Sequence, residues 1–138
     1  MNKDLVFKCG DHYFSYNISF IKEIKEWITP TVLPSTTKYI EGFINIRGEI
    51  IPVFDFMEII KEEKQSNKKA LIVVDCLNKL VAFSVFSVSD IIEYDHISNA
   101  PNNFVDGMNY INGIIENDNR SIFSINLIKL VEKVMVGE

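Results

Sequence analysis

Few side chains in this sequence are suited to catalysis. The chain has two histidines, His12 and His96, and two cysteines, Cys9 and Cys76. A histidine can act as a general acid or base, and a cysteine thiolate as a nucleophile or metal ligand. Each of these uses requires a second group at short range, either a base beside the nucleophile or several ligands around a metal. The spacing of the four residues decides whether such partners exist.

The surroundings of these four residues favour structural positions. His12 falls in a predicted hairpin turn and His96 just before a loop, which is typical of solvated histidines. Cys9 and Cys76 occupy matched places in the internal repeat described below, which favours a shared packing position. The sequence has no Gly-x-Ser-x-Gly, His-Glu-x-x-His, Cys-x-x-Cys or glycine-rich phosphate loop. We therefore expect no enzymatic activity, no metal site and no cofactor.

Charge argues against a nucleic-acid partner. Fourteen Lys and Arg residues against nineteen Asp and Glu give a net charge of −5. A protein that binds single strands needs basic residues interleaved with exposed aromatic platforms. Here the aromatic residues at 13–16 lie among polar uncharged residues and are more typical of core packing. A nucleic-acid-binding small β-barrel remains a distant alternative.

No segment predicts export or membrane insertion. Charged residues interrupt the first ten positions every few residues, so the apolar stretch of a signal peptide is missing. The longest apolar runs have four or five residues, whereas a bilayer needs about 18. We expect a cytoplasmic protein with reduced cysteines.

The chain reads as mostly β, because short runs rich in Val, Ile, Phe and Tyr alternate with turn residues. Residues 5–18, 43–54 and 71–83 predict three hairpins, and Gly48 supplies the positive φ for the second turn. Asp55 predicts the N-cap of a short helix, and the mixed-charge residues 61–69 an exposed linker. Helical spacing returns only at 126–134.

An internal repeat organises these elements. Tyr-Ile-Glu-Gly at 39–42 recurs as Tyr-Ile-Asn-Gly at 110–113, a shift of 71 residues, and earlier positions match at a shift of 67. The repeat predicts one domain, residues 1–138, made of two similar small β-barrel halves. The halves cover approximately 5–60 and 71–134, and the chain termini can be exchanged between them.

The turn at 45–49 contains Arg47, whose guanidinium offers five donors to a carboxylate or to carbonyl oxygens. Two interpretations stay open. In one, Arg47 is a solvated residue at a hairpin tip. In the other, a neighbouring acid holds it and presents it to a protein partner.

Residues 39–56 resemble the signature of the CheW family of chemotaxis coupling proteins. The glycine at 42, the Asn-x-Arg-Gly turn at 45–48 and the Pro-Val-x-Asp at 52–55 stand at the family's spacing, and residues 5–11 and 18–24 are also similar. The resemblance implies two five-stranded SH3-like barrels packed together, with short helices and a C-terminal helix. It also implies a non-catalytic adaptor in two-component signalling. Such an adaptor links the cytoplasmic tips of methyl-accepting chemoreceptors to the regulatory domain of a CheA-type histidine kinase, in membrane-associated arrays.

The resemblance also assigns partner-binding positions. Ile21 and Glu23 match the family's exposed strand residues, and Gly42 and Arg47 match its glycine and turn arginine. Ile28 and Val32, with Ile21 and Ile24, would line an apolar groove for a receptor's helical hairpin, although each aliphatic residue fits a core position equally well. Simple alternation turns Ile21 and Ile24 to opposite faces of their strand.

Phe86 is a departure from the family pattern, since it stands where an acidic residue is common. We include it among the partner-binding positions because that position belongs to the kinase-facing surface. It favours one alternative, a divergent paralogue that binds receptors but couples to another output or competes without activating the kinase.

Overall fold

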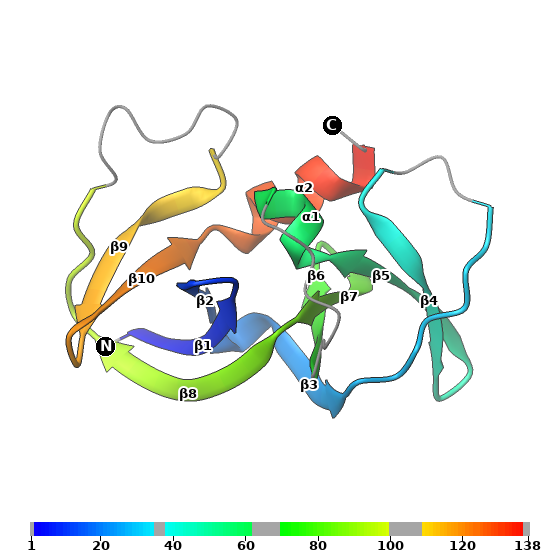
Figure 1. The fold of residues 1–138 in the computed structure, drawn as a ribbon, viewed down its shortest axis with the longest axis horizontal. Helices are drawn as coiled ribbons and strands as arrows, with labels where there is room; N and C mark the ends of the chain where they lie inside the picture. Colours follow the sequence, from blue (N-terminus) through cyan, green and yellow to red (C-terminus); the bar gives the residue numbers. More distant parts are fainter. Residues whose placement is uncertain (1, 35–37, 62–69, 100–108, 137–138) are drawn as a thin grey trace.

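The computed structural model describes residues 2–34, 38–61, 70–99 and 109–136, and in them the chain forms two five-stranded sheets side by side (Figure 1). Sheet 1 has the strand order β8 (Ser87–Tyr94), β1 (Asn2–Cys9), β2 (His12–Asn17), β10 (Arg120–Ile125) and β9 (Ile111–Asn117). Sheet 2 has the order β3 (Ile21–Glu26), β6 (Ala70–Cys76), β7 (Lys79–Val85), β5 (Glu49–Asp55) and β4 (Ile40–Ile46). The prediction of a mostly β chain with two five-stranded halves is confirmed.

Three short helical elements accompany the sheets, namely the 3₁₀ turn η1 (Ile18–Phe20), α1 (Phe56–Ile60) and α2 (Leu127–Val136). Figure 1 shows α1 and α2 together where the two sheets meet. The Asp55 carboxylate accepts a hydrogen bond from the Met57 backbone N–H at 3.0 Å, as an N-cap does. Asn126, 71 residues later, caps α2 by accepting from the Lys129 N–H at 3.1 Å. Of the predicted linker, residues 62–69 lie outside the described residues.

Each sheet combines strands from both halves of the sequence. The first hairpin, β1–β2, belongs to sheet 1 with β8, β9 and β10, and its counterpart β6–β7 belongs to sheet 2 with β3, β4 and β5. The hairpins join their sheets through parallel pairs, β2 with β10 and β5 with β7. Matched positions therefore have matched surroundings. The backbone N–H groups of the two capping residues donate to the carbonyls of Tyr39 and Tyr110, at 3.0 and 2.7 Å.

Burial on both faces explains why the strands read as continuous apolar runs. On β6, Leu71 and Val73 pack into a core inside sheet 2, while Ile72 and Val74 face a central core that both sheets and both helices share. On β1, Val6 faces a small core inside sheet 1, and Phe7 faces the central core. Each sheet thus curls around its own core and packs against the other sheet with its opposite face.

The predicted closure of each half into a barrel is not found among the described residues, because neither sheet forms a continuous circle of paired strands. Strands β3 and β8 end at Glu26 and Tyr94, before a ladder to the opposite edge strand can form. A single bridge spans each gap instead, Thr31 with Phe43 of β4 and Ser98 with Ile114 of β9.

Candidate functional site

Arg47 occupies the tip of the β4–β5 hairpin. Arg47 and Gly48 have φ angles of 51° and 86°, the left-handed pair of a tight two-residue turn. The Asn45 side chain accepts a hydrogen bond from the Gly48 N–H at 3.0 Å. The turn therefore fixes the backbone under an arginine whose side chain is 75% exposed.

Glu23 of β3 holds this arginine. Arg47 Nη1 donates to Glu23 Oε1 at 3.2 Å, and Lys25 Nζ donates to Glu23 Oε2 at the same distance. The hydrogen bond from Lys25, followed by the positive charge of Arg47, keeps the pKa of Glu23 below its ordinary value. The ion pair connects the two edges of sheet 2, from β3 to the hairpin that carries β4.

A β-bulge decides which residues of β3 share a face. Ile21 lies opposite Val74, but Glu23 lies opposite Val73, so the register shifts at Lys22. Ile24 then lies opposite Ile72, on the same face of β6 as Val74. The expectation that Ile21 and Ile24 point to opposite faces is wrong, because simple alternation ignores the extra residue.

The aliphatic residues expected at the site differ in exposure. Ile21 packs partly buried against the central core, whereas Ile24 is 47%, Ile28 44% and Val32 80% exposed. Val32 directly follows Thr31, whose bridge to Phe43 places it beside β4. The half-buried Trp27, the single tryptophan of the chain, precedes Ile28 and packs on the core of sheet 2.

Gly42 lies at the bridge between the Thr31 segment and β4. A Cβ atom on Gly42 would stand 2.7 Å from both the Thr31 carbonyl oxygen and the Pro30 Cβ. The close backbone approach therefore requires glycine. A direct contact of Gly42 with a partner stays a prediction.

The structure brings some of the seven expected residues together and leaves others apart. Glu23 and Arg47 are in contact, and Gly42 adjoins the segment that carries Val32. Phe86 is half-buried at a bend between β7 and β8, where the chain passes from sheet 2 to sheet 1.

Sequence reasoning missed a second acid–arginine pair at the matching place in sheet 1. Asp90 of β8 accepts two hydrogen bonds from Arg120 of β10, at 2.9 and 3.0 Å. This bidentate contact lowers the pKa of Asp90. Asp90 is 67 residues after Glu23, so the repeat contained the signal for the acid, but the arginine lies two residues beyond the position that matches Arg47.

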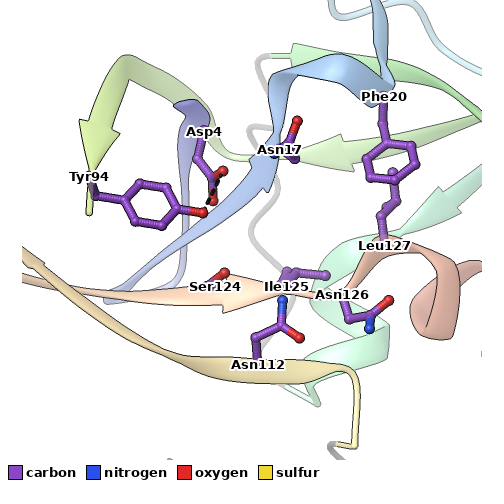
Figure 2. Close-up of a pocket in the computed structure, with 9 residues that line it drawn as sticks. All are labelled: Asp4, Asn17, Phe20, Tyr94, Asn112, Ser124, Ile125, Asn126 and Leu127. Carbon is purple, nitrogen blue, oxygen red and sulfur yellow. Dashed lines mark hydrogen bonds between the residues drawn. The ribbon is translucent and has the colours of Figure 1, made fainter. Parts of the chain in front are cut away.

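A polar pocket of about 160 Å³ lies in sheet 1, next to the start of α2 (Figure 2). Its lining residues are Asp4, Asn17, Phe20, Tyr94, Asn112, Ser124, Ile125, Asn126 and Leu127. Asp4 is only 1% exposed, and its carboxylate accepts hydrogen bonds from Ser15 Oγ at 2.7 Å and the Tyr94 hydroxyl at 3.0 Å. Burial raises the pKa of Asp4 above its ordinary 3.8, against the opposing effect of the two hydrogen bonds.

The raised pKa of Asp4 predicts a pH-dependent stability. The native state holds the Asp4 proton more tightly than the unfolded chain, so the contribution of this group to stability falls as pH rises from 3.8 through the raised pKa. We expect the free energy of unfolding of the wild type, minus that of Asp4→Asn, to be larger at pH 4 than at pH 7. Urea titrations of both proteins across this range measure the difference. A flat or rising difference would contradict the assignment.

Within the described ranges, no group of three or more His, Cys, Asp and Glu side chains could hold a metal ion. Both cysteines are buried and free. A separate search of the described residues finds no helix with the length and apolar character needed to cross a membrane.

Comparison with known proteins identifies the family. The model of the CheW-like domain matches residues 4–135. The chain is 32% identical to a chemotaxis protein CheW of Rhizobium meliloti over 90 residues, which are 64% of this chain and 58% of that protein. It is 26% identical to the chemotaxis protein CheW of Thermotoga maritima over 139 residues, 97% of this chain and 90% of that one.

A solved structure agrees with these matches. The scaffolding protein TtCheW of Thermoanaerobacter tengcongensis superposes with a TM-score of 0.81 at 29% identity, covering 90% of this chain and 88% of that one. The two sheets, the paired hairpins and the Glu23–Arg47 turn thus occur in a chain that the family model matches over nearly its full length. This protein belongs to the CheW-like family of chemotaxis scaffold proteins, which are adaptors and not enzymes.

Proposed function

We propose that this protein couples the cytoplasmic tips of chemoreceptors to the regulatory domain of a CheA-type histidine kinase. The observation that carries the proposal is the exposed Arg47, held by Glu23 at the tip of a fixed turn. An arginine fixed before binding loses little conformational entropy when a partner pairs with it. Arginine is also enriched among the residues that dominate binding energy at protein interfaces.

Apolar residues beside the ion pair complete a plausible contact surface. We call Glu23, Ile28, Val32 and Arg47 the β3–β4 surface. Val32 is 80% and Ile28 44% exposed, so both aliphatic side chains lose contact with water when a partner covers them. A central apolar area beside a charged group is the usual composition of a protein interface. The same surface and the partly buried Ile21 and Phe86 are the positions at which we place the kinase and receptor contacts.

The proposed partners also give the proposed location. A receptor's signalling tip lies in the cytoplasm, so the protein would act there and would reach the membrane only through receptor arrays. No cofactor and no nucleic acid enters this scheme, and the acidic net charge of −5 disfavours the latter.

Calorimetric titration tests the two contacts separately. The protein is titrated with the regulatory domain of a CheA kinase from the same organism, and then with a soluble fragment of a receptor tip. Saturable binding to both, with dissociation constants in the micromolar range, supports the coupling function. Binding to the receptor fragment alone would favour the paralogue that couples to another output. Binding to neither would contradict the proposal.

Arg47→Ala tests the β3–β4 surface directly. We expect about tenfold or more weaker binding to the kinase domain, because truncation of an arginine at the centre of an interface removes about 2 kcal/mol or more of binding energy. The melting temperature should stay close to that of the wild type, since the side chain is exposed. Lys3→Ala is the matched control, because Lys3 forms an exposed ion pair with Glu93 in sheet 1. Equal affinities for the two variants would remove Arg47 from the contact.

A further inference from the structure

We propose that the polar pocket beside Asp4 binds a small primary ammonium group. The carboxylate of Asp4 is buried, and among the described residues no lysine or arginine pairs with it. Its two hydrogen bonds come from neutral hydroxyl groups, so the negative charge itself stays uncompensated. A cation placed in the pocket would supply the missing positive charge.

The lining of the pocket suits the three N–H donors of an ammonium group. The Tyr94 hydroxyl donates to Asp4, so its oxygen keeps lone pairs that can accept from a ligand. Ser124 and Asn112 add a hydroxyl and an amide oxygen on the neighbouring strands β10 and β9 (Figure 2). The ligand therefore reaches the charge of Asp4 through Tyr94, in the same way that hydrogen bonds in a chain polarise one another.

Size and charge together narrow the class of ligand. A volume of about 160 Å³ is smaller than the roughly 300–1,000 Å³ of pockets for drug-sized ligands, so the pocket admits a small head group. One carboxylate is a poor site for a divalent cation, which prefers several charged oxygen ligands. The start of α2 also borders the pocket, and its partial positive charge would favour an anion. Asp4 outweighs it, because Asp4 carries a full charge and the Asn126 side chain already caps the helix.

Methylammonium chloride is the probe for this site. Titration into the ¹⁵N-labelled protein, followed by amide chemical shifts, should give saturable changes at the pocket residues with a dissociation constant in the millimolar range. Tetramethylammonium chloride, which has no N–H donor, and sodium chloride should give no saturable change at equal ionic strength. Equal responses to all three salts, or a saturable response to sodium acetate in place of methylammonium, would overturn the proposal.

Variants distinguish the charge from the surrounding structure. Asp4→Asn and Tyr94→Phe should each weaken methylammonium binding about tenfold, since each removes a charged or hydrogen-bonded step between ligand and carboxylate. Tyr94→Phe keeps the ring and decides the question if Asp4→Asn does not fold. Glu93→Gln is the control, because Glu93 is an exposed carboxylate next to Tyr94. Wild-type affinity in Tyr94→Phe, or loss in Glu93→Gln, would contradict the assignment.

Two sources could supply the ammonium group, a free small amine or a lysine side chain. Blocked lysine, acetylated at its α-amino group and amidated at its carboxyl group, separates them. Binding comparable to methylammonium supports the side chain of a partner protein, and binding of methylammonium alone supports a free amine. The site is independent of the coupling function, because Glu23 and Arg47 lie in sheet 2. Arg47→Ala should therefore bind methylammonium with wild-type affinity.

Discussion

Gly113→Ala is expected to lower the free energy of unfolding by about 3 kcal/mol, at the upper end of the usual range for overpacking. A Cβ atom on Gly113 would collide with the backbone carbonyl oxygen of Ser98 and would stand 2.5 Å from Ile97 Cγ2. The carbonyl cannot retreat freely, because it accepts the Ile114 N–H at 2.8 Å in the bridge between the two segments. Urea denaturation followed by circular dichroism measures the loss.

Gly48→Ala is the control for backbone conformation. Gly48 has a positive φ of 86°, but a Cβ atom there meets nothing within 4 Å. Its substitution therefore costs only the strain of the left-handed conformation, roughly 1–2 kcal/mol. If Gly113→Ala costs no more than Gly48→Ala, the bridge is not a tight contact and the explanation fails.

The same reasoning connects Gly42 with the proposed interface. Gly42 meets Thr31 as Gly113 meets Ser98, which is why the Tyr-Ile-x-Gly segment occurs in both halves of the repeat. A side chain at Gly42 would displace Thr31 and with it the neighbouring Val32 of the β3–β4 surface. The glycine thus supports partner binding through the position of the surface, whether or not it touches the partner.

Local features of this fold could be predicted from the sequence. The Arg47–Gly48 turn, the Asp55 cap and the helix after Asn126 depend on residues within a few positions of one another. The repeat carried the arrangement further, because Arg47–Gly48 predicts the equivalent turn at Asp118 and Asn119, both of which have positive φ.

Features that depend on register or on distant contacts could not be predicted. The bulge at Lys22 reverses the expected facing of Ile24, and no residue type marks it. Asp4 is hidden because its partners Ser15 and Tyr94 are 11 and 90 residues away. A charged residue near the start of an apolar strand is indistinguishable in sequence from an exposed one until the sheet is assembled.

Phe56→Ala is expected to have the largest effect on stability, a loss of about 3–5 kcal/mol. Phe56 begins α1 and is fully buried between the sheets. Its ring centroid lies 5.0 Å from that of Phe7 and 4.9 Å from that of Phe14, both in sheet 1, and 6.5 Å from that of Phe83 in sheet 2. Against a typical stability of about 5–15 kcal/mol for a whole domain, this truncation removes a large part of the total.

The position of Phe56 also predicts how the protein unfolds. Because the ring belongs to the core that both sheets share, its loss should destabilise sheet 1 and sheet 2 equally. Trp27 fluorescence reports on sheet 2, and hydrogen exchange of the amides that pair β1 with β8 reports on sheet 1. We expect both signals to move to lower urea concentration together, while Ile50→Ala, at a 63% exposed position, shifts neither. Separate transitions in Phe56→Ala would show that each sheet is held by its own core, and that the repeat produced two units instead of one.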